Sequence, residues 1–329
     1  MSFRLFFALS LLLASPYLCA ADLPGIPQFI DEMVAKHQFK HDELVQIFQR
    51  AQYRQAVIDA ISTPATTKPW LEYRAAFINP KRINGGLQFW QRHADALQRA
   101  ENQYGVPQEI IVALIGVETM YGNNSGKYGV LDALTTLAFD YPRRAGFFRD
   151  ELEQYLLLVR DQDFELFKIK GSYAGAMGIP QFMPSSYRKY AVDFSGDGKI
   201  DLLHDPVDAI GSVANYLKQY GWLSGEPVTA RASIGENGRV ESLAGSHAVA
   251  DWVASGVQPE NLVAMDKTAR LADFTVAEGK EYWLAFNNFD VITRYNNSDF
   301  YAMSVYQLAE ALRGNFQEER PQSPIFRPD

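Results

Sequence analysis

The chain has 329 residues, with 31 Lys and Arg against 39 Asp and Glu, and a formal net charge of −8 at pH 7. Hydrophobic residues make up 47% and charged residues 21%, which excludes a largely disordered chain and leaves ample material for a buried core. The acidic balance argues against a general nucleic-acid binder, and the single cysteine excludes an internal disulfide or a cysteine-rich metal site.

The N-terminus has the pattern of an export signal. Arg4 precedes an apolar run over 5–14, and small residues follow at 20–21. This order is typical of a secretory signal peptide, and the run is too short to span a membrane comfortably. A lipid anchor on Cys19 is the alternative, but Leu18 stands where a lipoprotein signal needs a small residue. We therefore expect a soluble, exported, periplasmic protein without a transmembrane segment.

The region after the signal is predicted to be mostly helical up to residue 224. Apolar residues recur at helical spacing from 29 to about 61, and a turn-rich stretch follows at 63–69. A long amphipathic helix is predicted over 84–104. Gly105 ends it, and Pro107 opens the next helix.

The pattern changes after residue 225. Residues 228–234 alternate between apolar and polar side chains, and Asn237-Gly238 is a strong turn signal. Residues 282–286 predict another strand, with a short helix near 247–255 between the two. These features indicate a small α+β subdomain over 225–290.

A last helix is predicted after Ser298, its N-cap, with Gly314 at its end and an extended tail from Gln317. The fold class is therefore mainly α (α+β). The predicted division is a signal peptide at 1–21, an N-terminal helical segment at 22–75, a helical core at 76–224, the α+β subdomain at 225–290, and a C-terminal helix and tail at 291–329 that complete the core.

Glu118 lies on the apolar face of a predicted helix. Ile111, Leu114, Ile115 and Glu118 are spaced i, i+3, i+4, i+7, and Glu118 falls in the last turn before Gly122. Burial and the negative end of the helix dipole both raise the pKa of a carboxyl group. A carboxylic acid that stays protonated near neutral pH can act as a general acid. An ion pair with a basic residue at the helix end is the alternative.

Residues 193–201 match the first nine positions of an EF-hand calcium loop. Oxygen donors fall at positions 1, 3 and 5, and a glycine that permits a sharp turn falls at position 6. The match departs at position 12, where His204 replaces the bidentate glutamate. Asp208, near the start of a predicted helix capped by Asp205, could supply a carboxylate to the ion, or it could only compensate the helix dipole.

Two further segments suit a ligand. The loop 171–186 has three glycines and few charges, so a ligand could approach its backbone closely, or it could simply connect two helices. The segment 294–301 mixes aromatic rings with amide groups, a combination that suits sugar rings.

Taken in order along the chain, five motifs resemble the lytic murein transglycosylase B family. They are Gly116-Val-Glu-Thr-Met-Tyr-Gly122, Pro142-Arg143-Arg144, the glycine-rich loop from Ser172, the Asp-rich loop and Arg294-Tyr295-Asn296. The resemblance covers about residues 29–312. It implies a lysozyme-like helical core with an α subdomain and a small β-containing subdomain. The implied activity is cleavage of the MurNAc-β-1,4-GlcNAc bond of peptidoglycan, without water, to leave a 1,6-anhydromuramic end.

The resemblance also assigns residues, motif by motif. It implies Glu118 as the single catalytic acid/base. The residues implied to line the saccharide groove are Tyr73, Arg143, Arg144, Ser172, Gln181, Tyr216, Tyr295, Asn296 and Tyr301. The implied ligands of a structural calcium ion, in an EF-hand-like loop over 193–208, are Asp193, Ser195, Asp197, the Lys199 carbonyl and Asp208, with Asp205 and Asp201 as alternatives to Asp208.

Two other functions remain open from the sequence. A lysozyme would break the same bond with water. A non-catalytic, calcium-stabilised cell-wall module would bind peptidoglycan without cleaving it. In each case the expected partner is the glycan strand of peptidoglycan, and no organic cofactor and no nucleic acid are expected.

Overall fold

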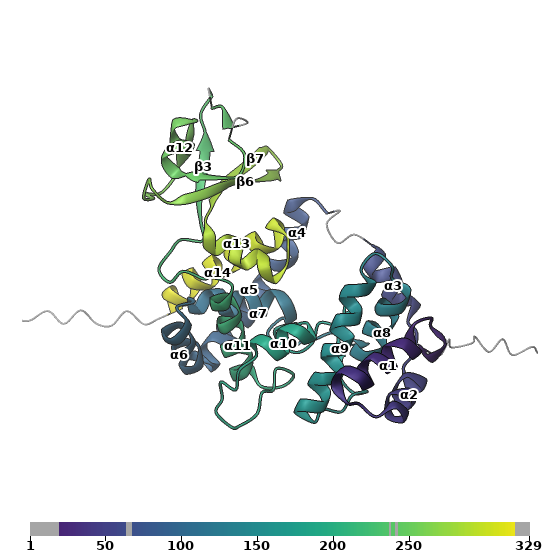
Figure 1. Ribbon diagram of the computed structural model, residues 1–329. Helices are drawn as coiled ribbons and strands as arrows, with labels where there is room; N and C mark the ends of the chain where they lie inside the picture. Colours follow the sequence, from purple (N-terminus) through teal and green to yellow (C-terminus); the bar gives the residue numbers. More distant parts are fainter. Residues whose placement is uncertain (1–19, 64–67, 237, 241–242, 320–329) are drawn as a thin grey trace, which may run out of the picture.

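The computed structural model describes residues 20–63, 68–236, 238–240 and 243–319 (Figure 1). The signal sequence with Cys19, Asn237 of the predicted turn and the tail from residue 320 lie outside the described residues. Within the described ranges, no helix is both long and apolar enough to cross a membrane.

The described residues are mostly helical. The helices are η1 Ala20–Asp22, α1 Ile26–His37, α2 His41–Arg50, α3 Gln55–Ser62, α4 Trp70–Phe77, α5 Pro80–Arg92, α6 Ala94–Tyr104, α7 Gln108–Thr119, α8 Val130–Asp140, α9 Ala145–Gln162, α10 Pro184–Tyr190, α11 Pro206–Gln219, α12 Val249–Ala254, α13 Asn287–Tyr295 and α14 Asp299–Glu319. The strands are β1 Tyr128–Gly129, β2 Lys170–Gly171, β3 Thr229–Ile234, β4 Ser246–Ala248, β5 Val257–Pro259, β6 Thr268–Val276 and β7 Gly279–Ala285.

Helices α1–α3 pack with α8 and α9, and these five helices form the α lobe, on the right in Figure 1. Phe29 of α1 meets Phe139 of α8 edge to face, with ring centroids 5.8 Å apart. Arg54, just before α3, donates two hydrogen bonds to Asp132 of α8 at 2.8 and 3.0 Å. The α lobe thus contains helices from before and after residue 75, where a boundary was predicted. The division of the chain into subdomains stays a prediction.

Helix α7 lies in the middle of a second group of helices, the core lobe, where it packs against α5, α6, α11 and α14. Every residue from Ile110 to Val117 is buried, so this helix meets protein on all sides along most of its length. The core lobe therefore fixes the place at which α7 ends, which is where Glu118 stands.

The single helix predicted over 84–104 is wrong. The chain breaks at His93, which ends α5 and begins α6 with non-helical dihedral angles (φ −116°, ψ 25°). The break redirects the chain, because α5 packs on α7 and α14 whereas α6 packs mainly on α11.

The predicted end of the last helix is also wrong. Ser298 does cap α14, because its hydroxyl accepts a hydrogen bond from the Tyr301 amide at 3.3 Å. The helix nevertheless runs through Gly314 to Glu319. Its last turns gain a packing partner, since Phe316 stacks on Trp90 with centroids 4.4 Å apart.

Strands β3–β7 form an antiparallel sheet in the order β4-β6-β7-β3-β5, and with α12 they make the β lobe at the top of Figure 1. The strands predicted at 228–234 and 282–286 and the helix near 247–255 are confirmed as β3, β7 and α12. The longest strand, β6, is not among those predicted. Arg270 of β6 ties the sheet to the core lobe through ion pairs with Asp290 and Asp299 at 2.8 and 2.7 Å.

Candidate active site

Glu118 stands in the last turn of α7, where the chain reverses sharply. Met120, Tyr121 and Gly122 follow in succession with φ values of 52°, 63° and 84°. Two consecutive non-glycine residues in the left-handed region are unusual, and such strained positions concentrate at functional sites. The Thr119 hydroxyl holds the turn, since it donates to the Ile179 carbonyl at 2.7 Å and accepts from the Gly122 amide at 2.9 Å.

The side chain of Tyr121 folds back under α7. Its hydroxyl donates a hydrogen bond to the Arg82 carbonyl on α5 at 2.9 Å. A Cβ atom on Gly116 or on Gly86 would come within 2.5 Å of this hydroxyl. Both glycines are therefore required by the close approach of the tyrosine between the two helices.

The environment of Glu118 moves the titration of its carboxyl group close to neutral pH. Burial raises its pKa from 4.5 to about 7, while a hydrogen bond from Tyr301 and the charge of Arg82 oppose that rise. The expected rise in the pKa is confirmed, and burial, one of the two expected causes, is its largest cause. A group with this pKa can both give and take a proton at neutral pH.

Tyrosines from three elements surround the Glu118 carboxyl group. The hydroxyl of Tyr301, on α14, donates directly to Glu118 Oε1. Tyr295, at the end of α13, stacks beside Tyr301 with centroids 6.5 Å apart and an interplanar angle of 12°. Tyr73, on α4, is close enough for the Glu118 charge to raise its pKa, although burial is the larger cause.

Tyr216 has a different place from the one suggested. It is 5% exposed, and its hydroxyl donates to the Arg294 carbonyl at 2.8 Å. Its ring lies 4.8 Å from that of Tyr295. Tyr216 therefore presents almost no surface to a saccharide, and it supports Tyr295 from within the core.

The glycine-rich loop borders the Glu118 site. It contacts the end of α7 through Ile179, and the Pro180 carbonyl accepts a hydrogen bond from the Tyr295 hydroxyl. Within the loop, Ser172 Oγ accepts from the amides of residues 174 and 176 at 3.2 and 3.1 Å. The Gln181 amide group donates to the carbonyls of residues 125 and 178 at 3.0 and 2.9 Å. Ser172 and Gln181, the two side chains expected to contact a saccharide, therefore also hold the loop in its conformation.

The other predicted groove residues are exposed. Arg143 and Arg144 lie just before α9, in the α lobe, and the Arg144 guanidinium covers the Phe147 ring at 4.1 Å. Asn296 follows Tyr295 at the surface. The structure thus brings the tyrosines and the loop to Glu118, and it leaves the two arginines on a different lobe.

Asp208 organises the predicted calcium loop from within. It is 1% exposed, and its carboxylate accepts hydrogen bonds from the amides of Phe194, Ser195 and Asp201, each at 2.8 Å. The cap of α11 is Asp205, whose carboxylate accepts from the Val207 amide at 2.7 Å. Asp208 therefore points into the loop and does not serve as the helix cap.

Hydrogen bonds to the Asp193 side chain organise the first half of the predicted calcium loop. The Asp193 carboxylate accepts from the amides of Gly196 and Gly198 at 2.7 and 2.8 Å. Gly198, at position 6, has a φ of 86°. These bonds hold the Asp193 pKa below its usual value, with the Gly196 amide as the largest cause. Among the described residues, however, no three acidic or histidine side chains converge as a ready metal cluster.

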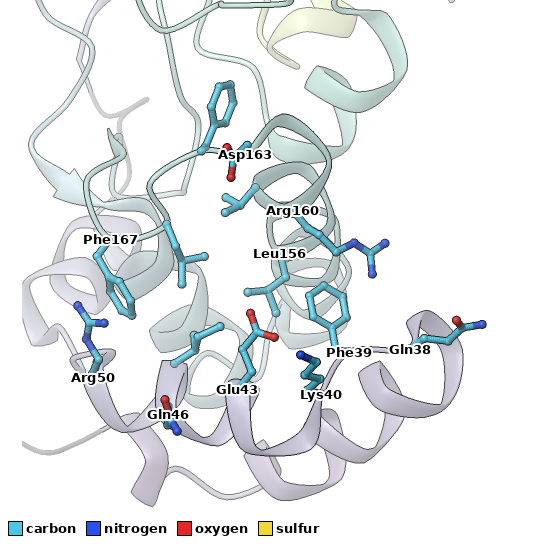
Figure 2. Close-up of a pocket in the computed structure, with 14 residues that line it drawn as sticks. Gln38, Phe39, Lys40, Glu43, Gln46, Arg50, Leu156, Arg160, Asp163 and Phe167 are labelled. Carbon is cyan, nitrogen blue, oxygen red and sulfur yellow. The ribbon is translucent and has the colours of Figure 1, made fainter.

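A cavity of about 630 Å³ lies elsewhere, between the α1–α2 connection and α9 (Figure 2). Arg50 lies over the Phe167 ring at 3.8 Å and Arg160 over the Phe39 ring at 4.6 Å. No predicted site residue is among those that line this cavity.

The sequence did not indicate that Arg82 lies next to the Glu118 site. This arginine is 9% exposed and donates hydrogen bonds to the Gly116 and Val117 carbonyls. An arginine in an amphipathic helix is ordinarily expected on the solvated face. Asn79 followed by Pro80 is a typical helix N-terminus, so the start of α5 can be predicted from the sequence. No sequence signal shows which face of α5 packs against α7.

Comparison with known proteins identifies the family. The transglycosylase SLT domain family matches residues 23–310. Membrane-bound lytic murein transglycosylase B of Escherichia coli strain K12 is 46% identical over 302 residues, which cover 89% of this chain and 83% of that protein.

Solved structures of lytic transglycosylases are similar to this chain over most of its length. The soluble lytic transglycosylase SltB1 of Pseudomonas aeruginosa superposes with a TM-score of 0.83 at 47% identity, over 89% of this chain and 99% of that chain. The Escherichia coli lytic transglycosylase Slt35 in complex with calcium gives a TM-score of 0.84 at 45% identity, over 90% of this chain and 95% of that chain. The expected mainly α fold with a lysozyme-like core is thereby confirmed. The chain belongs to the transglycosylase SLT domain family and is a peptidoglycan lytic transglycosylase.

Proposed function

We propose that Glu118 is the single acid/base of this enzyme and that the bond cleaved is the MurNAc-β-1,4-GlcNAc bond. The observation that carries the proposal is a partly buried carboxyl group with a pKa of about 7, hydrogen-bonded by Tyr301 and bordered by tyrosine rings. Flat aromatic faces suit sugar rings, and a carboxyl group in this state can protonate a leaving oxygen at neutral pH.

In the first step, the Glu118 carboxylic acid gives its proton to the glycosidic oxygen as the C1–oxygen bond of the muramoyl residue breaks. The neighbouring N-acetyl group of the substrate stabilises the positive charge that develops at C1. The tyrosines and the glycine-rich loop limit the access of water. Glu118 is left as a carboxylate that the Tyr301 hydroxyl and the Arg82 charge stabilise.

In the second step, the Glu118 carboxylate removes the proton from the muramoyl 6-hydroxyl. The oxygen of that hydroxyl attacks C1 and closes the 1,6-anhydro ring. Glu118 gives one proton in the first step and takes up one proton in the second. The enzyme therefore returns to its starting state, and no water is consumed.

One carboxylate is enough for this cycle, whereas most glycosidases use two. Glu109, the other glutamate of α7, stands in the first turn of the helix and lies 3.9 Å from Arg313. Burial also raises the pKa of Glu109. Glu109 is therefore a matched control: it is a partly buried glutamate on the same helix, and the proposed reaction does not use it.

The test compares Glu118→Gln with Glu109→Gln in the release of soluble fragments from purified peptidoglycan. The amide cannot give a proton, so we expect loss of turnover in the first variant and near wild-type turnover in the second. Circular dichroism and thermal melting establish that both are folded. A folded Glu118→Gln enzyme that keeps its turnover contradicts the assignment.

We further propose that Tyr73, Tyr295, Ser172, Gln181 and Asn296 form the saccharide groove, with Arg143 and Arg144 contacting the substrate from the α lobe. Tyr301 is as buried as Tyr216, and it acts through its hydrogen bond to Glu118. The exposure of the two arginines supports this role, since a polymeric substrate extends beyond the cleaved bond. Tyr216 is assigned to the support of Tyr295.

We also propose a structural calcium ion in the EF-hand-like loop 193–208. The side chains fit the hard oxygen-donor chemistry of calcium, and the Asp193 and Gly198 geometry supports the choice. Asp193, Ser195, Asp197 and the Lys199 carbonyl would hold the ion, with Asp208 as the closing carboxylate. The ion would tie the exposed loop together and leave the chemistry to Glu118.

Export to the periplasm is proposed from the N-terminal pattern at 1–21 and from the location of peptidoglycan. A relative described as membrane-bound keeps the lipid anchor on Cys19 as an alternative. Fractionation of cells that express the full chain, with Cys19→Ser as the control, distinguishes the two: only an anchored protein moves from the membrane to the soluble fraction in the variant.

A further inference from the structure

A buried arginine supports the end of the catalytic helix. Arg82 is 9% exposed. Its Nη1 donates to the Gly116 and Val117 carbonyls of α7, and its Nη2 donates to the Ala76 carbonyl of α4 at 3.3 Å. The Gly116 carbonyl also accepts a hydrogen bond from the Met120 amide at 3.1 Å. A cation near the last carbonyls of a helix is favourable. The two α7 carbonyls belong to the residues that immediately precede Glu118.

The backbone of Arg82 is held as firmly as its side chain. Its amide donates to the Asn79 side chain at 3.1 Å, which caps α5. Its carbonyl accepts the hydrogen bond from Tyr121 at 2.9 Å. The guanidinium also lies 5.1 Å from the Phe77 ring. Arg82 therefore links α4, α5 and both sides of the turn that carries Glu118.

The Arg82 charge is not neutralised by these neutral partners. Carbonyl groups and an aromatic ring orient a guanidinium, but they do not cancel its charge, and Nε is buried without a hydrogen-bond partner. A buried cation destabilises a fold unless a negative group is nearby. The Glu118 carboxylate, when it forms, is such a group, because the two charges act on each other's pKa.

We propose that Arg82 is a positioning residue for the reaction: it fixes the last turn of α7, and its charge stabilises the Glu118 carboxylate that forms between the two steps. The inference rests on the proposed role of Glu118 as acid/base. It assigns the arginine no contact with the substrate.

The test uses Arg82→Met, which removes the charge, and Arg82→Lys, which keeps the charge but not the fork of donors. Arg92→Met, an exposed arginine on the same helix, is the matched control. The readouts are thermal melting, kcat and KM on soluble glycan oligomers across pH, and the Glu118 pKa from the carboxyl NMR signal that is absent in Glu118→Gln.

For Arg82→Met we expect kcat to fall about 10- to 100-fold, with KM changed less than about threefold, because the catalytic group is misplaced and its anion is less stable. The Glu118 pKa and the basic limb of kcat/KM should both move up by roughly one pH unit. Arg82→Lys should lose kcat while its Glu118 pKa stays close to that of the wild type, and Arg92→Met should match the wild type throughout.

A folded Arg82→Met enzyme with an unchanged Glu118 pKa and an unchanged pH profile overturns the proposal. So does a loss of folding in both Arg82 variants, since the arginine would then be structural only. Failure of the acid/base assignment itself has a separate signature, because Glu118→Gln would then retain turnover whatever the Arg82 variants do.

Discussion

The hydroxyl of Tyr301 donates a hydrogen bond to Oε1 of Glu118, although the two residues are 183 positions apart in the sequence. Tyr301 is 3% exposed and lies on α14, which packs directly on α7. The contact joins the C-terminal helix to the catalytic turn, so the last part of the fold must be in place before the site is complete.

Tyr301→Phe should raise the Glu118 pKa above about 7, because the removed hydrogen bond favours the charged form. A hydrogen bond to a charged group contributes roughly 1.5–3 kcal/mol, so kcat should fall at least about tenfold. The pH dependence of kcat/KM checks the first effect, and its basic limb should move to higher pH. Tyr306→Phe, on the same helix, is the control. An unmoved pH profile would show that the contact has no role in the reaction.

Glu118→Gln should be more stable than the wild type above pH 7. The pKa is raised in the folded state, so the folded enzyme binds the Glu118 proton more tightly than the unfolded chain does. This contribution to stability is complete below pH 4.5 and is lost as the pH rises through about 7. The advantage of the glutamine variant should reach roughly 2–3 kcal/mol at pH 8 and shrink toward pH 5.

Thermal melting at both pH values measures this difference. Glu278→Gln, in the exposed turn between β6 and β7, should show no such pH dependence. An equal stability difference at pH 5 and pH 8 for Glu118→Gln would mean that burial does not control the titration of this group.

Calcium should raise the melting temperature of the wild type, and a chelator should reverse the increase. At about 100 times the dissociation constant, the expected gain is roughly 2.7 kcal/mol. Asp193→Asn should abolish the calcium response with little effect on the metal-free protein. Asp208→Asn should lower the stability even without calcium, because it weakens a buried acceptor of three backbone amides. Identical melting curves with calcium and with chelator would refute the site.

Replacing Arg143 and Arg144 together by Ala should raise KM for glycan strands and leave kcat near the wild-type value. Both side chains are exposed and lie on the α lobe, so they can contribute uniform binding but not the chemistry. Stability should change by less than about 1 kcal/mol. Arg50→Ala removes an exposed arginine of the same lobe that also covers an aromatic ring. A KM that rises equally in this control would indicate a nonspecific charge effect.

The sequence placed Glu118 at the end of a helix with apolar residues at i, i+3 and i+4, and the family resemblance assigned its role. The structure confirms the helix, but every residue from Ile110 to Val117 is buried, so α7 has no solvated face along that stretch. The Asp205 cap and the β3 and β7 strands were likewise visible, since each depends on neighbouring residues only.

The parts that the sequence did not predict depend on packing between distant segments. The break at His93 is set by the different partners of α5 and α6. The burial of Arg82 follows from the crossing of α5 and α7, and the burial of Tyr216 follows from its position beneath Tyr295. Helical periodicity alone places each of these residues on a plausible helix without showing what covers it.

The account is tested most directly by the mass of the fragments that the enzyme releases from purified peptidoglycan, for the wild type and Glu118→Gln side by side. It predicts muropeptides that are one water lighter than the products of hydrolysis, and none of them from the variant. Reducing-end products of full mass from the wild type would contradict it and show a lysozyme, and the absence of any fragments from the wild type would indicate a binding protein.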